Sequence, residues 1–325
     1  MQNHRFIPKY KVSYRVSSLS EVIDWGATLL NVPKSWNDTK GKGIIVGVID
    51  TGKPTHSDIS SAIVDSYDFT GEGVLDNEGH STATCGTLGA RANNNGIIGI
   101  APECSIITLK ALDSNGSGEF DWIISAVYKA IELKVDILNL SLGAPMGDKR
   151  LLSALIEASK AGITVVCANG NDGGPVNFPA AYSIQVPGLI AVSAIDKNKN
   201  IADFSSHGKE TVLSAPGVDM LVPYLNNKYA KLNGTSFSAP FVAGCAALIL
   251  SKHRIKQGST PINTPEDLKK HLLYLVSDAG KSGFDDYFGH GIIDFTNWAT
   301  IEDKLPPTEP VKTPTICDVI KSWFK

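Results

Sequence analysis

The stretch GIIVGVID, residues 43–50, is apolar throughout until it ends on an acidic side chain. Four further short runs are similarly apolar and rich in β-branched residues: SIITLKAL (105–112), VDILNLSL (135–142), GITVVCAN (162–169) and GLIAVSAI (188–195). None of them alternates cleanly between apolar and polar positions. This pattern is typical of strands that are buried on both faces of a parallel sheet.

Helical patterns separate these runs, at about residues 80–90, 119–134 and 149–162. Alternating strands and helices predict an α/β fold in which helices flank a mostly parallel central sheet, giving three layers. In such folds, sites form at the carboxyl ends of the strands. The candidate site positions are therefore Asp50, residues 141–143 and residues 169–171, each of which ends or follows a predicted strand.

Composition and charge exclude several classes of function. The 325 residues are 42% hydrophobic and 19% charged, which is ordinary for a soluble globular protein. A net charge of −3 without a Lys/Arg stripe argues against a nucleic-acid partner. No uninterrupted apolar run reaches the roughly 18 residues of a membrane span, so no transmembrane segment is expected.

The cysteines and the start of the chain indicate a compartment. The five cysteines are odd in number and lack metal-binding spacing, and four of them stand in apolar or small-residue runs. The first 25 residues contain no apolar core of a secretory signal. Buried thiols and no signal predict a protein of the reducing cytoplasm.

The stretch LNGTSFSAPFVAGCAALILSKH, residues 232–253, begins a long apolar run with a glycine and several hydroxyl side chains. One Ser or Thr suffices to cap a helix, so the others require a second explanation. A serine at a helix N-terminus lies near partial positive charge and free backbone N–H groups, which stabilise a developing oxyanion. Ser236 is therefore a candidate nucleophile, although an N-cap alone would also explain it.

Asp50 and His80 complete the candidate constellation, and each also has a purely structural interpretation, as a cap or as core filler. The chain order Asp, His, Ser is that of subtilisin. The contexts VIDTG, HSTATCGT and NGTSFSAP resemble those of the subtilisin-like serine proteases, the subtilases. Because the resemblance extends over about residues 25–297, the chain is identified as a member with a subtilisin-like fold.

The resemblance implies a serine endopeptidase that hydrolyses peptide bonds of proteins. Ser236 would be the nucleophile, His80 the general base and Asp50 the group that orients the imidazole. Asn171, in CANGNDGG, would donate the second hydrogen bond to the oxyanion. A catalytically silent homologue that acts as a binding or regulatory module is the alternative, and retention of these four residues argues against it.

The resemblance also assigns the substrate-binding residues. Two segments would pair with an extended peptide as edge strands, and a third would form the wall of the primary specificity pocket: Gly116, Ser117 and Gly118; Ser141, Leu142 and Gly143; Ala168, Asn169 and Gly170. The sequence departs from the family at Ser81, Phe237 and Asn177, where Gly, Met and Gly are common. Because Asn177 stands at the pocket floor, the family's substrate preference is not carried over.

A structural Ca²⁺ site is implied by "HSD" and RANNNGI (91–97). Its ligands would be the side chains of Asp58 and Asn93 and main-chain oxygens of the loop, a hard oxygen set that calcium prefers. The loop residues concerned are Arg91, Asn95 and Ile97. An ordinary polar turn is the alternative.

The N-terminal segment FIPKYKV, residues 6–12, resembles the LIPY-x-V extension of intracellular subtilisins. We expect residues 1–24 to be a propeptide-like inhibitory extension that lies across the cleft of a catalytic domain formed by residues 25–300. Phe6, Ile7, Tyr10 and Val12 would occupy side-chain pockets, and Pro8 would keep the backbone out of attack geometry. Cleavage further along the chain would activate the enzyme.

Residues 301–325 combine a proline-rich linker with a short amphipathic tail, ICDVIKSWFK. The apolar residues of this tail fall on one helical face. Docking onto its own domain or onto a second copy in a homodimer is one interpretation. Attachment to a partner or to a membrane surface is the other.

Overall fold

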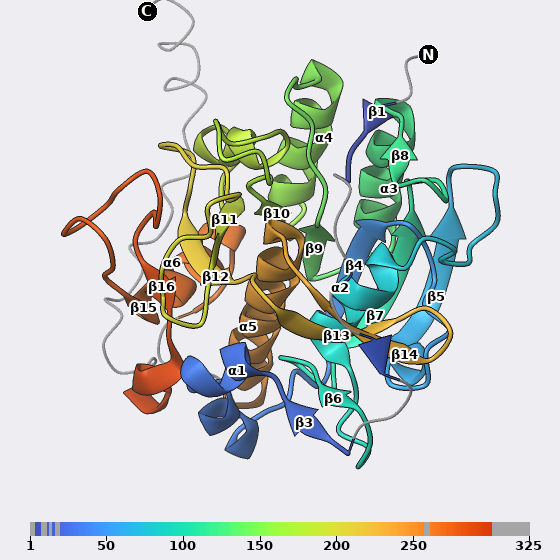
Figure 1. Cartoon of the computed structure of the whole chain (residues 1–325). Helices are drawn as coiled ribbons and strands as arrows, with labels where there is room; N and C mark the ends of the chain where they lie inside the picture. Colours follow the sequence, from blue (N-terminus) through green and yellow to red (C-terminus); the bar gives the residue numbers. More distant parts are fainter. Residues whose placement is uncertain (1–3, 8–11, 13–14, 17–19, 257–260, 301–325) are drawn as a thin grey trace, which may run out of the picture.

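The computed structural model describes residues 4–7, 12, 15–16, 20–256 and 261–300 (Figure 1). The expectations for Pro8, Tyr10 and the tail at 301–325 lie outside these residues.

A nine-stranded sheet forms the centre of the molecule, in the order β15-β16-β12-β11-β10-β9-β4-β7-β5. All neighbouring strands are parallel except β15 and β16, which are antiparallel. The strands are β4 (Ile45–Asp50), β5 (Ile63–Asp68), β7 (Ser105–Lys110), β9 (Ile137–Leu140), β10 (Thr164–Ala168), β11 (Ile190–Ile195), β12 (Leu213–Pro216), β15 (Val276–Ser277) and β16 (Ile292–Ile293). The mostly parallel α/β sheet is confirmed, and each of the five predicted runs contains a strand.

Helices cover both faces of this sheet, which gives three layers (Figure 1). Helix α2 packs against α5, and α3 packs against α4. The α-helices are α1 (Trp25–Leu29), α2 (His80–Gly89), α3 (Phe120–Glu132), α4 (Lys149–Lys160), α5 (Thr235–Lys256) and α6 (Pro265–Tyr274). Four short 3₁₀ helices span Val32–Asn37, Ser60–Ala62, Ala180–Ile184 and Phe295–Thr300.

Helix α5 is the central helix and contacts β9, β10, β11 and β12. Among the described residues it is the one helix that is long and apolar enough to cross a membrane, and 94% of the window concerned is buried inside the protein. A count of uninterrupted apolar residues missed it because small and hydroxyl residues interrupt the run. Burial on this scale is what a core helix requires, since it is apolar on all sides.

Short strands connect the N-terminal residues to three parts of the molecule. Strand β1 (His4–Arg5) pairs with β8 (Ser117–Gly118). Strand β2 (Arg15–Val16) adds to a hairpin formed by β13 (Met220–Tyr224) and β14 (Lys228–Leu232). Strand β3 (Val22–Ile23) runs parallel to β6 (Ile97–Ile98).

Four cysteines, Cys85, Cys104, Cys167 and Cys245, are buried free thiols, as predicted. Burial raises the pKa of Cys104 to about 12, so this thiol remains protonated. Cys317 lies outside the described residues.

Candidate active site

Strand β4 ends on Asp50, and helix α2 begins on His80, so the two side chains meet at the carboxyl edge of the sheet. The Nδ1 atom of His80 lies 2.8 Å from Asp50 Oδ1 and 3.0 Å from Oδ2. The backbone N–H of Thr51 and the hydroxyl of Thr84 also donate to this carboxylate, at 2.7 and 3.2 Å. Both members of the pair are 1% exposed. The carboxylate therefore fixes the orientation of the imidazole.

The charge around His80 increases its basicity. Burial lowers the pKa of His80, but the charge and hydrogen bond of Asp50 outweigh this effect, and the pKa is raised above its ordinary value. Glu78 and Asp76 contribute in the same direction. Glu78 also accepts a hydrogen bond from the backbone N–H of His80, at 2.9 Å.

Asp76 holds the residues on either side of His80 in place, a role that was not predicted from the sequence. This buried carboxylate accepts five hydrogen bonds: from Thr51 Oγ1 (2.8 Å), Glu78 N (3.1 Å), Gly79 N (2.8 Å), Thr82 N (2.8 Å) and Thr82 Oγ1 (2.6 Å). It accepts hydrogen bonds from N–H groups at the start of α2 that have no partner within the helix, and it links them to Thr51, the residue after Asp50. An acidic residue four positions before a helix-initiating His was the available signal.

Ser236 lies in the first turn of α5 and is 5% exposed. Its hydroxyl donates to the carbonyl oxygen of Ser141 at 3.3 Å, and the hydroxyl of Ser141 donates back to the carbonyl of Ser236 at 2.8 Å. The ring of the following residue, Phe237, lies 6.0 Å from the imidazole of His80. The starts of α5 and α2 therefore face one another. Ser81, one residue into α2, has no positive φ and so is unstrained there.

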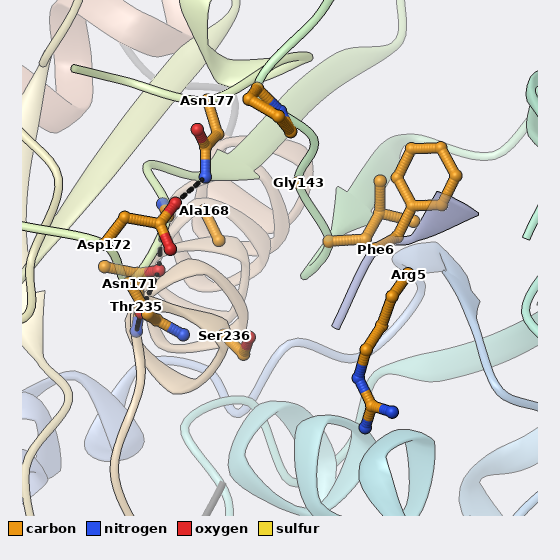
Figure 2. Close-up of a pocket in the computed structure, with 12 residues that line it drawn as sticks. Arg5, Phe6, Gly143, Ala168, Asn171, Asp172, Asn177, Thr235 and Ser236 are labelled. Atoms are coloured by element: carbon orange, nitrogen blue, oxygen red, sulfur yellow. Dashed lines mark hydrogen bonds between the residues drawn. The ribbon is translucent and has the colours of Figure 1, made fainter. Parts of the chain in front are cut away.

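Asn171 is fixed by Thr235, the residue before Ser236. Its Oδ1 accepts hydrogen bonds from the backbone N–H and the hydroxyl of Thr235, both at 2.9 Å. Its Nδ2 lies beside Gly234, and a Cβ added to Gly234 would be 3.2 Å from this nitrogen. The φ of +154° at Gly234 also favours glycine at this position. Figure 2 shows Asn171, Thr235 and Ser236 together on one side of a pocket.

The pocket beside Ser236 has a volume of about 340 Å³. It is lined by Arg5, Phe6, Leu142, Gly143, Pro145, Ala168, Gly170, Asn171, Asp172, Asn177, Thr235 and Ser236. Most of the predicted wall is thus present. Asn169 lies behind that wall, because its buried side chain donates to Ser206 O (3.1 Å) and Thr211 Oγ1 (2.9 Å). Asn169 therefore supports the pocket and does not line it.

Residues 4–7 lie between the two segments that were expected to bind an extended peptide. In the antiparallel register, His4 faces Gly118 and Arg5 faces Ser117. The N–H of Ile7 donates to Gly116 O at 3.2 Å, and on the other side the N–H of Gly143 donates to Phe6 O at 3.0 Å. Phe6 and Ile7 are each 1% exposed, so the side chains of this segment are packed into the folded domain.

Asp58 and the loop at residues 91–97 also meet, as expected. Asp58 Oδ2 accepts hydrogen bonds from Ile97 N at 2.9 Å and Tyr229 Oη at 3.0 Å, and Oδ1 accepts one from Asn93 Nδ2 at 3.4 Å. Within the described residues, no cluster of three or more His, Cys, Asp or Glu side chains could hold a metal ion. Any cation here would depend on amide and main-chain oxygens in addition to Asp58.

Glu21 is a second acidic residue at this loop and was not anticipated. Its Oε1 accepts the backbone N–H of Asn94 at 2.7 Å, next to the pairing of β3 with β6. Only the tertiary fold places it there, because 73 residues separate the partners.

The sequence profile of the subtilase family matches residues 41–291. The chain therefore belongs to the subtilase family, the class of subtilisin-like serine endopeptidases. Relatives include the major intracellular serine protease of Bacillus subtilis, 38% identical over 76% of this chain and 80% of its own length. Subtilisin DY of Bacillus licheniformis is 38% identical over 85% of this chain and 98% of its own. The minor extracellular protease Epr of Bacillus subtilis is 37% identical over 85% of this chain, but the match spans only 42% of that longer protein.

Proposed function

We propose that the chain hydrolyses internal peptide bonds of proteins through Asp50, His80 and Ser236, with Asn171 in the oxyanion hole. The buried contact between His80 and Asp50, together with the place of Ser236 in the first turn of α5, is the observation that carries this proposal. Family membership supports it.

Each group has a defined chemical task. With Nδ1–H directed to Asp50, the Nε2 atom of His80 takes the proton of Ser236 as Oγ attacks the substrate carbonyl carbon. Asp50 stabilises the imidazolium ion that results. Nδ2 of Asn171 and the backbone N–H of Ser236 donate to the oxyanion, and His80 then returns the proton to the leaving amine.

Labelling with a fluorophosphonate tests this assignment, because the reagent modifies only an activated serine. We expect one adduct, on Ser236, and none in Ser236→Ala. Ser238→Ala is the matched control, because Ser238 is a buried serine of the same helix whose hydroxyl donates to Ala215 O and Pro216 O. An adduct that persists in Ser236→Ala, or no adduct in the active protein, would contradict the proposal.

We further propose that residues 1–24 inhibit the enzyme until they are cleaved. The support is the pairing of residues 4–7 with both sides of the cleft, where a peptide substrate would lie. A chain that begins near Ser20 should hydrolyse peptides without a lag. The full chain should show a lag that shortens with protein concentration, and Pro8→Ala should shorten it further. Equal rates for the intact and shortened chains would refute inhibition.

We propose that a Ca²⁺ ion stabilises the loop at residues 91–97. The support is the contact of the Asp58 carboxylate with this loop, through Ile97 N and Asn93 Nδ2, beside the main-chain oxygens of Arg91, Asn95 and Ile97. A half-turn of the Asn93 carboxamide would point its oxygen at Asp58, an arrangement that a cation between the two would stabilise. A chelator should then lower the thermal midpoint of the wild type. An unchanged melting curve would remove the site.

A cytoplasmic location is proposed because two relatives, from Bacillus subtilis and Paenibacillus polymyxa, are named intracellular serine proteases. Fractionation of the native host, with detection in the culture medium and in the soluble cell extract, tests this proposal. Accumulation in the medium alone would contradict it.

A further inference from the structure

The pocket beside Ser236 ends on a polar pair, Asp172 and Asn177 (Figure 2). Asn177 Nδ2 donates to Asp172 Oδ2 at 2.8 Å. An added Cβ at Gly170 would lie 2.4 Å from Asn177 Nδ2, and one at Gly143 would lie 3.1 Å from Asn177 Cβ. The side chain of Asn177 therefore packs against the backbone of two pocket walls and takes up room inside the pocket.

The carboxylate of Asp172 retains acceptor capacity. Asn177 engages only Oδ2, and the ion pairs among the described residues do not include Asp172. Arg5, which also lines the pocket, donates its Nε to Ile7 O at 2.7 Å. Figure 2 shows Arg5 on the opposite side of the pocket from Asp172.

The remaining walls suit an unbranched apolar stem. Leu142, Ala168 and Pro145 contribute hydrocarbon surface, and Gly143 and Gly170 contribute backbone. Lys and Arg have long methylene stems and a charged end, and they bury the stem while the end stays near polar groups and water. The pocket matches this pattern: its apolar walls suit the methylene stem, and the exposed carboxylate of Asp172 suits the charged end.

We propose that this pocket selects a basic side chain, lysine or arginine, on the residue whose carbonyl group is attacked. The inference rests on the proposed function of Ser236 and specifies its substrate class. The cation of the substrate donates to the free oxygen of Asp172, and Asn177 holds that carboxylate in place. A large aromatic side chain is disfavoured because Asn177 occupies part of the space, and an acidic one is repelled by Asp172.

The test compares peptide substrates that differ only at this residue: lysine, methionine, phenylalanine or glutamate. The full-length protein is first incubated until its rate is constant. We expect kcat/KM for lysine to exceed that for methionine by about tenfold, as a hydrogen bond between charged partners would give. Because Asp172 is exposed, this ratio should decrease as salt is added.

Asp172→Asn is the decisive variant, because it removes the charge and keeps the shape. It should lower kcat/KM for lysine about tenfold and leave methionine within about twofold. Asp196→Asn, which changes a partly exposed loop aspartate that accepts from Asn198 N and Asn200 N, is the matched control and should alter neither. Asn177→Gly should increase the rate with phenylalanine by enlarging the pocket.

Two results would overturn the inference. If the wild type prefers methionine or phenylalanine to lysine, the pocket assignment is wrong, while hydrolysis itself upholds the function of Ser236. If the preference for lysine survives in Asp172→Asn, Asp172 is not its origin. Hydrolysis of none of the peptides, together with no fluorophosphonate adduct, would overturn the proposed function and this inference together.

Discussion

Asp50 and Asp58 lie eight positions apart and are both almost fully buried, but their hydrogen-bond partners differ in whether they can become charged. Asp50 faces His80, a side chain that becomes a cation when it accepts a proton. Asp58 receives hydrogen bonds from three neutral donors, Ile97, Tyr229 and Asn93. Burial and the charge of Asp58 raise the pKa of Tyr229, which keeps its hydroxyl a donor. Asp50 thus faces a group whose protonation changes during the proposed reaction, whereas Asp58 holds donors that keep their protons and connects segments of the fold.

Replacing members of the Asp50 constellation should have the largest effects. Ser236→Ala and His80→Ala should each abolish nearly all turnover, and the double variant should lose little more, because the residues act as a unit. Losses in kcat that multiply in the double variant would show that the two residues act independently.

Asp50→Asn should reduce kcat by about 10³–10⁴-fold, because the amide favours the wrong tautomer of His80. The thermal midpoint should change far less than activity does. Steady-state kinetics and calorimetry on the same preparation measure both. A large loss of stability with little loss of kcat would make Asp50 a structural residue, like Asp58.

Asp58→Ala should show the reverse pattern. The backbone N–H of Ile97 and the hydroxyl of Tyr229 lose their acceptor, at a cost of about 2–4 kcal/mol and a lowering of the midpoint on the order of 5 °C. The response to a chelator should also disappear.

The matched control for Asp58→Ala is Asp65→Ala. Asp65 likewise accepts a tyrosine hydroxyl (Tyr67, 2.7 Å) and a backbone N–H (Ser66, 2.8 Å), but at the surface. Its loss should change the free energy of unfolding by less than about 0.5 kcal/mol. Equal losses for the two variants would show that burial of Asp58 is not the cause.

The smallest effect concerns pH. The charge of Glu78 helps to raise the pKa of His80, so Glu78→Gln should lower that pKa. Because the neutral imidazole is the active base, the acid limb of kcat/KM should move to lower pH. Glu72→Gln is the control, since Glu72 contacts Ser114 and Lys110 and not His80. A shift toward higher pH would contradict the argument.

The sequence predicted the elements whose signals are local. Buried strands such as residues 45–50 have a characteristic composition, and Asp50, His80 and Ser236 stand at ends of elements where motifs are readable. It did not predict Glu21 at the loop of residues 91–97 or Asp76 as a five-fold acceptor, because long-range packing or local hydrogen-bond geometry creates those contacts. The sequence motif predicted that Asn169 lines the pocket, but its side chain points away toward Thr211. The direction of a side chain after a strand depends on such neighbours, which the local sequence does not reveal.

The pairing of β1 with β8 and of β2 with β14 attaches one short piece of chain at two places. When β1 leaves the cleft, the covalent link to β2 keeps it nearby, at an effective concentration on the order of millimolar. Dissociation of β1 without cleavage therefore opens the cleft only briefly. A competing peptide must exceed the effective concentration of β1 to remain bound. Under the activation by cleavage proposed above, one cut between the two strands would let β1 be lost by dilution, so that a reversible equilibrium would become a one-way change.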